Sequence, residues 1–151
     1  MSQAATPPVV SDRSPMQVWI VGFLALIWNA IGAFDYVMTE THNAAYLAGL
    51  SPKVLEYIDN FPAWATAVWA LAVWGGVVGS ILLLLRKRLA VWVFGVSLVA
   101  MVLTTVYQYG LSNGLEVMTG AGPKVFTCVI FVIALGLFLY SRRLAAKGIL
   151  A

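Results

Sequence analysis

The stretch "FPAWATAVWALAVWGGVVGSILLLLRKRLAVWVF", residues 61–94, contains two apolar runs that are separated only by Arg86, Lys87 and Arg88. The first run, and the second as it continues toward residue 109, each reach the roughly 17–25 apolar residues with which a helix crosses the hydrocarbon of a bilayer. Such a short connection forces the two helices to lie antiparallel. The sequence therefore predicts membrane-spanning helices near 64–85 and 89–109, joined by a basic turn.

The composition of the whole chain agrees with this local pattern. The chain is 62% hydrophobic and 10% charged, with a mean hydropathy of +0.91, whereas soluble domains are about 45–50% apolar and about 25% charged. Two further apolar stretches, near 16–38 and 124–141, are long enough to span a membrane. We therefore expect an all-α integral membrane protein, with residues 1–151 forming a single four-helix transmembrane bundle. Residues 1–15 would be a flexible cytoplasmic leader and residues 142–151 a basic cytoplasmic tail.

The Lys and Arg residues predict the orientation of the bundle. Lys53 and Lys124 are the only cations expected on one side, and Arg13 lies with the remaining cations on the other. By the positive-inside rule both termini are then cytoplasmic, and the net charge of +3 reflects membrane topology and not nucleic-acid binding. The other topology-determining residues are Arg86, Lys87, Arg88, Arg142, Arg143 and Lys147.

The outer loop between the first two spans contains its own helical signal, "SPKVLEYIDNFP" at residues 51–62. Ser51 is a candidate N-cap, Pro52 suits the first helical position, and Pro62 ends the pattern. We expect a short amphipathic helix that covers the outer surface of the bundle or membrane; a docking element for a partner is the alternative. Its apolar face consists of Val54, Leu55, Ile58 and Phe61.

Small residues mark the expected packing face of the second span. Apolar side chains gain little by leaving lipid, so helices in membranes associate through close backbone approach and interhelical hydrogen bonds. We expect this face to hold a helix of the same chain, with a homodimer seam as the alternative. The predicted packing residues are Ala72, Gly75, Gly76, Gly79 and Ser80, together with Gly32 on the first span.

Polar residues on the first and third spans form a candidate pocket. Asn29 lies near the middle of its span and must face the protein interior, because an unsatisfied amide is costly in hydrocarbon. The others lie toward the outer end, where they could meet in one outward-opening cluster. Hydrogen bonds that only stabilise helix packing are the favoured interpretation, and a binding site is the alternative. The candidate pocket residues are Asn29, Asp35, Tyr36, Thr104, Tyr107 and Gln108.

The single Cys128 and the single His42 limit the available chemistry. One cysteine gives no intrachain disulfide or dithiol pair, and one histidine without a second ligand at suitable spacing gives no metal or bis-histidine haem site. No arrangement of nucleophile, base and orienting group is visible in the sequence. We therefore expect no enzyme activity, no metal and no cofactor.

The pattern W-N-x-x-G-x-x-D-Y-x-M-T at residues 28–39, P-x-W at 62–64, and G-x-x-x-G at 75–79 before the basic turn resembles a family of small four-span bacterial inner-membrane proteins. The resemblance covers most of residues 17–109. It implies a bacterial, proteobacterial inner membrane and a four-helix bundle, and it assigns no role to any residue.

Two hypotheses of function follow from these features. The first is a non-enzymatic accessory or scaffold component of a larger membrane assembly. The alternative is a small oligomeric permease or solute-binding membrane protein that uses the outward-facing polar pocket. The expected partners are the lipid bilayer and either a membrane protein or further copies of the chain.

Overall fold

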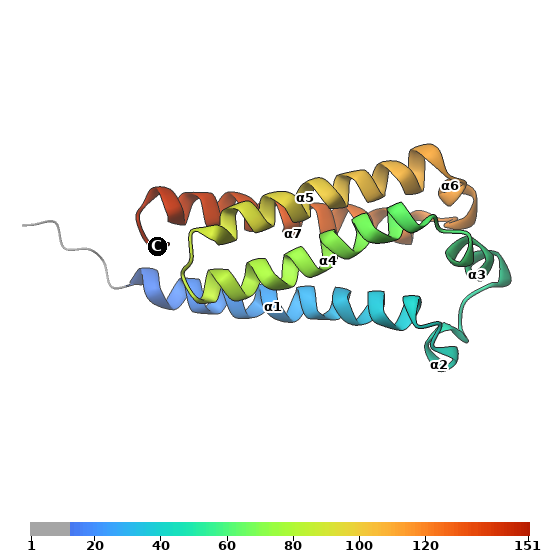
Figure 1. Cartoon of the computed structure of the whole chain (residues 1–151), viewed down its shortest axis with the longest axis horizontal. Coiled ribbons are helices and arrows are strands. Elements are labelled where there is room, and N and C mark those ends of the chain that lie inside the picture. Colours follow the sequence, from blue (N-terminus) through green and yellow to red (C-terminus); the bar gives the residue numbers. More distant parts are fainter. Residues whose placement is uncertain (1–12) are drawn as a thin grey trace, which may run out of the picture.

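The computed structural model describes residues 13–151, and this part of the chain is helical with no strands. Four long helices lie side by side along the long axis of the molecule (Figure 1), and each is long and apolar enough to cross a membrane. The predicted four-helix bundle is therefore confirmed. The long helices are α1 (Arg13–Glu40), α4 (Ala63–Leu84), α5 (Leu89–Val106) and α7 (Ala121–Ala146).

The short elements gather at one end of the bundle, which we call the loop end (Figure 1). A short helix is present where the amphipathic pattern predicts one, and its buried residue is Tyr57. Its neighbour among the short elements is α6, which in turn packs against a π-helical turn that continues α5. The short elements are α2 (Ala44–Leu47), α3 (Pro52–Asp59), the π-helical turn Tyr107–Leu111 and α6 (Gly114–Val117).

The largest difference from the expected boundaries lies at the end of the fourth span. Residues 142–146, expected in a basic tail, continue α7. Leu137, Ser141 and Leu144 recur at helical spacing and are all buried, so packing carries the helix past Arg142 and Arg143. Of the expected leader, residues 1–12 lie outside the described residues, and residues 13–15 begin α1.

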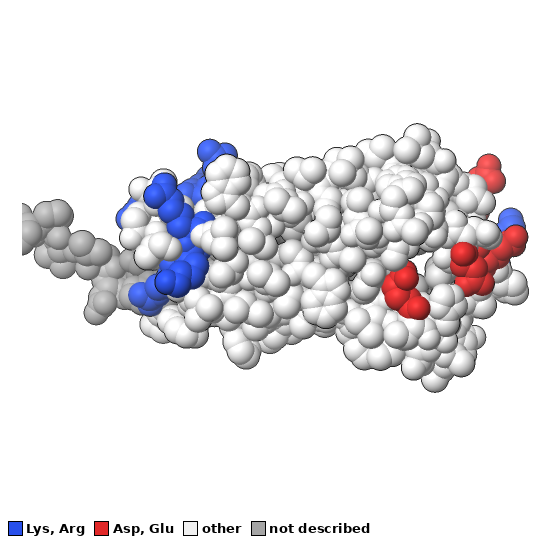
Figure 2. All heavy atoms as spheres, viewed as in Figure 1, with Lys and Arg blue, Asp and Glu red and all other residues white. Residues whose placement is uncertain are grey.

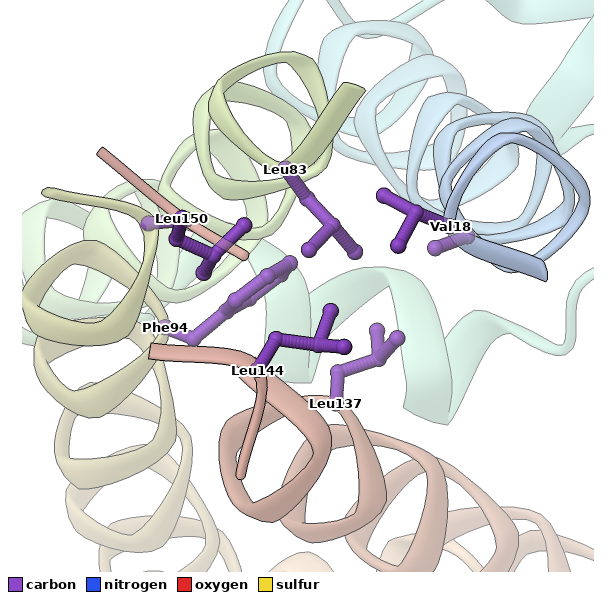
Figure 3. Close-up of a cluster of buried hydrophobic side chains, with 8 residues drawn as sticks. Val18, Leu83, Phe94, Leu137, Leu144 and Leu150 are labelled. Carbon is purple, nitrogen blue, oxygen red and sulfur yellow. The ribbon is translucent and has the colours of Figure 1, made fainter. Parts of the chain in front are cut away.

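The α4–α5 hairpin is the centre of the bundle, because α4 packs against both α5 and α1 while α5 also packs against α7. The end that carries the Arg86–Arg88 turn, which we call the basic end, contains the hydrophobic core. In Figure 3 side chains from all four long helices point toward one another there. The cluster consists of Val18, Ala25, Leu83, Ala90, Phe94, Leu137, Leu144 and Leu150.

Three of the long helices end in the same way, with one residue in the left-handed region of backbone conformation. These residues are His42 after α1 (φ 50°), Arg86 after α4 (φ 54°) and Gly148 after α7 (φ 70°). At each end two backbone N–H groups donate back to carbonyls of the last turn, as Gly148 and Ile149 do to Ala145 and Leu144. This Schellman motif reverses the chain sharply. Glycine favours the conformation, so Arg86 occupies it at a cost.

After that reversal, residues 148–151 fold back onto the α4–α5 turn and form what we call the C-terminal clasp. The backbone N–H of Ala151 donates to the carbonyl of Arg86 at 2.7 Å, and the N–H of Arg88 donates to the carbonyl of Ala151 at 2.6 Å. The side chain of Leu150 inserts into the hydrophobic core, where only 4% of the residue is exposed. The clasp therefore joins the end of α7 to the central hairpin.

We predict that Leu150→Ala destabilises the bundle by about 2–5 kcal/mol, because it removes a buried side chain and leaves a cavity. Thermal or denaturant unfolding of the purified protein in detergent measures the effect. Leu139→Ala is the matched control. It makes the same change of side chain in the C-terminal half of α7, but Leu139 is 41% exposed. Equal stability of the two variants would contradict the clasp.

Candidate functional site

A polar junction joins α1 to α4 in the middle of the bundle. The Asn29 amide nitrogen donates to the Ala25 carbonyl at 2.8 Å and to the Ser80 hydroxyl at 3.2 Å, and Ser80, fully buried, donates to the Gly76 carbonyl at 2.8 Å. A Cβ atom at Gly76 would overlap the Asn29 amide. The absence of a side chain at Gly76 therefore gives the asparagine its space beside α4.

The other small residues of α4 face α5. The Ser97 hydroxyl donates to the Ala72 carbonyl at 2.5 Å. A Cβ atom on Gly75 would lie 2.9 Å from the Ser97 Cβ, and one on Gly79 would lie 2.7 Å from the Phe94 ring. Helices of the same chain thus fill this face of α4. Gly32 differs, because a Cβ built there meets no atom within 4 Å.

The structure does not bring the six candidate pocket residues together. Asn29 belongs to the junction with Ser80. Asp35 is exposed and accepts a hydrogen bond from the Tyr46 hydroxyl at 2.6 Å. Thr104 is buried and donates to the Ala100 carbonyl of its own helix. Within residues 16–151, whose side chains are described, no hydrogen bond joins any two of the six.

The remaining three lie in separate surroundings at the loop end. Tyr36 packs edge-on against Trp69, with ring centroids 4.9 Å apart. The backbone carbonyl of Gln108 accepts from the Ser112 hydroxyl at 2.8 Å. Tyr107 packs between Phe61 and Trp64, with ring centroids 4.9 and 5.1 Å away. The physical reason for the separation is bulk, because aromatic side chains from residues 57–69 stand between α1 and the end of α5.

These rings form a continuous set that we call the aromatic cluster. Phe61 is its centre and contacts Tyr57, Trp69 and Tyr107 at centroid distances of 5.9, 6.3 and 4.9 Å. All of these pairs are edge-to-face, the arrangement that the aromatic quadrupole favours. The cluster ties α1, α3, α4 and the π-helical turn together. Its members are Tyr36, Tyr57, Phe61, Trp64, Trp69 and Tyr107.

A polar pocket of about 210 Å³ lies beside this cluster, between α3 and α6; we call it the loop-end pocket. Two contacts hold the segments around it together: the Tyr57 and Ser112 hydroxyls share a hydrogen bond of 2.8 Å, and Gly114 packs so closely on the Gln108 carbonyl that a Cβ would collide with it. Burial raises the pKa of the Tyr57 hydroxyl. The pocket is lined by Lys53, Glu56, Tyr57, Asn60, Tyr107, Asn113, Glu116 and Val117.

Sequence reasoning missed this pocket because its walls come from three separate segments. The helical pattern of residues 51–62 places Lys53 and Glu56 on a solvated face, and nothing in it shows that α6 lies opposite. The only available signal was the Asn113–Gly114 pair, which marks a tight turn. Among the described residues, Lys53, Glu56 and Glu116 form no ion pair within the chain, so their charges remain open to the pocket or to solvent.

His42 and Asp59 connect the end of α1 to α3. The His42 Nε2 lies 2.9 Å from the Asp59 carboxylate and its Nδ1 lies 3.1 Å from the Glu40 carbonyl, so both ring nitrogens face acceptors. The hydrogen bond to Asp59, with a smaller effect of Glu40, raises the pKa of His42 above 6.5. The described residues contain no group of three metal-ligating side chains.

The outer surface of α4 and α5 carries an apolar groove of about 590 Å³. Trp74, Gly75 and Trp92 are among its lining residues, and it lies along the parts of α4 and α5 that are apolar enough to cross a membrane. It offers no polar group for recognition of a solute.

No protein-family model matches this chain, and no curated protein and no solved structure matches it either. The four-helix membrane bundle and the contacts described above are thus the basis for any assignment of function.

We predict that Gly76→Ala destabilises the bundle by about 1–3 kcal/mol, because the new methyl group displaces the Asn29 amide. Unfolding in detergent measures the loss. Gly136→Ala is the matched control, since a Cβ there meets no atom within 4 Å. Adding Asn29→Ala to Gly76→Ala should remove the overlap. The double variant should therefore lose less stability than the sum of the losses in the two single variants. Additive effects would contradict the junction.

We predict that the His42 ring titrates above 6.5 and that Asp59→Asn lowers its pKa. The chain has one histidine, so a single NMR titration reports it. The folded-state pKa of His42 is raised, so its contact with Asp59 stabilises the folded protein fully below about pH 6.5. This stabilisation is lost as the pH rises through the folded-state pKa. Asp35→Asn, which alters the contact with Tyr46, is the control and should leave the titration unchanged. A wild-type pKa at or below 6.5 would contradict this contact.

Proposed function

We propose that this protein is a non-enzymatic accessory component of a larger assembly in a bacterial inner membrane, with both termini cytoplasmic. The observation that carries the proposal is the exposure of α7. Only 6% of the residues in its apolar span are buried inside the chain, against 22–28% in the other three spans. Few residues of α7 are therefore fully covered by its own bundle, which leaves part of its surface for lipid or for another membrane protein.

Small residues on α7 support a protein partner. Gly122 and Gly136 are exposed, and a Cβ at either position would meet no atom of the chain. Small residues on an outer helix face allow the backbone of another helix to approach closely, which is how helices associate in lipid. In α4 the same residue type already serves this purpose, because Gly75 and Gly76 seat side chains of α5 and α1.

The charge distribution supports the proposed topology. Figure 2 shows Lys and Arg side chains gathered mainly at the basic end, whereas the Asp and Glu side chains in view lie at the loop end, beside a smaller basic area. Loops rich in Lys and Arg stay cytoplasmic in bacterial membranes. The resemblance to small four-span inner-membrane proteins supports the same compartment.

A second candidate is a solute-binding membrane protein, alone or as an oligomeric permease. The loop-end pocket favours it, because a partly open space of about 210 Å³ with Lys53, Glu56 and Glu116 at its walls suits a small polar molecule. The deep polar residues give the permease less support, since Asn29 and Thr104 make their hydrogen bonds within the helix packing.

The experiment that tests the proposal is gentle purification of the protein from its native membrane, followed by identification of what accompanies it. We expect stable companion subunits with the wild type and their loss with Gly136→Leu, which blocks close approach to α7. Ala30→Leu, on the exposed face of α1, is the control and should retain them. A pure homo-oligomer carrying a bound small molecule would contradict the accessory role and support the second candidate.

A further inference from the structure

The basic end of the molecule carries a concentrated positive side-chain charge, and no described acidic side chain pairs with it. Among the residues with described side chains, 16–151, the one ion pair is that of His42 with Asp59 at the loop end. The described acidic side chains are also at that end, as Figure 2 shows. We call the cations of the basic end the basic patch: Arg86, Lys87, Arg88, Arg142, Arg143 and Lys147.

The helix dipoles do not offset this charge. α4 and α7 end at the basic end, which brings two partial negative charges there. α1 and α5 begin at the same end and bring two partial positive charges. Because each helix terminus carries a charge of about half a unit, the four contributions cancel and leave the side-chain charge of the patch in place.

The C-terminal clasp brings together two basic segments that lie far apart in the sequence, residues 86–88 and 142–147. Its two backbone hydrogen bonds hold residue 151, just beyond α7, against Arg86 and Arg88. The guanidinium group of Arg142 lies 5.7 Å from the centre of the Phe138 ring, which fixes it near the surface of α7. Lys87, Arg88, Arg142, Arg143 and Lys147 are all exposed at this end.

The position of the patch relative to the membrane surface points to a lipid headgroup as its partner. Two exposed tryptophans lie next to it: Trp92, 75% exposed, is one helical turn after Arg88, and Trp19, 55% exposed, lies near the start of α1. Exposed tryptophans of membrane helices sit at the headgroup level, and basic pockets between helices at that level recognise anionic lipid headgroups. Arg86 itself lies in the left-handed region (φ 54°), so the chain reversal after α4 begins on a cation of the patch.

We propose that the basic patch, held together by the C-terminal clasp, is a binding site for the phosphate headgroup of an anionic phospholipid in the adjacent leaflet. The proposal is independent of the accessory role. The α4–α5 turn supplies one side of the site and the end of α7 supplies the other, so both segments and the contact between them are required.

The test uses the full-length protein in vesicles of phosphatidylcholine with increasing phosphatidylglycerol. Brominated phosphatidylglycerol quenches the exposed tryptophans, and its quenching relative to brominated phosphatidylcholine gives the lipid preference. We expect a preference for phosphatidylglycerol that falls with salt. Neutralising Lys87 and Arg88 to Gln together should remove most of it, a loss larger than the roughly five-fold that corresponds to about 1 kcal/mol for one independent charge near an anionic surface.

Three comparisons separate this site from a diffuse surface charge. Arg142→Gln with Arg143→Gln should reduce the preference as much as the turn pair does, and all four changes together should do little more, because one site is lost in each case. Leu150→Ala keeps every charge but loosens the clasp, so it should also reduce the preference. Lys53→Gln with Lys124→Gln, away from the patch, is the matched control and should leave it unchanged.

The proposal is overturned by strictly additive losses, or by an equal loss in the Lys53 and Lys124 control. It is also overturned if Leu150→Ala retains the full preference while remaining folded. Inorganic phosphate should compete poorly with the lipid; equally effective competition would identify a soluble phosphate as the ligand and contradict a membrane source.

Discussion

The close approach of α4 to its two neighbours is the constraint on which the rest of the bundle depends. In lipid, burial of apolar side chains against one another gives little net stabilisation, so helices need short backbone distances and interhelical hydrogen bonds. Gly76 and Ser80 receive Asn29 from one side, and Ala72 and Gly75 receive Ser97 from the other. With α4 fixed between α1 and α5, α7 packs mainly against α5, and few residues of its apolar span are buried.

Much of this fold could be predicted because hydrocarbon thickness and sequence spacing determine it. The length of each apolar run and the basic turn at residues 86–88 were sufficient for four spans and a central hairpin. The end of α7 was not predictable in this way. Arg142 and Arg143 suggest that the chain leaves the membrane, whereas the burial of Ser141 and Leu144 keeps it helical to residue 146. That burial depends on tertiary packing with the clasp, which a one-dimensional pattern does not contain.

The candidate site shows the same division. The depth of Asn29 and the cost of an unsatisfied amide indicated that it must face protein, and its partner in the structure is Ser80. Depth alone could not show which side chains meet at the loop end. Tyr36 and Tyr107 have similar expected depths, yet Trp69 and Phe61 stand between them. The loop-end pocket was missed for a related reason, since Lys53 and Glu116 come from segments whose proximity depends on the π-helical turn and on Gly114.

The C-terminal clasp also has a consequence for the order in which the molecule is assembled. Chains fold from the N-terminus during synthesis, so the α4–α5 hairpin is complete long before residues 148–151 exist. Until then the Arg88 N–H and the Arg86 carbonyl lack the partner that Ala151 provides, and the place of Leu150 in the core is open. The basic end is therefore the last part of the bundle to form its native contacts, and it can form them only after α7 has been inserted.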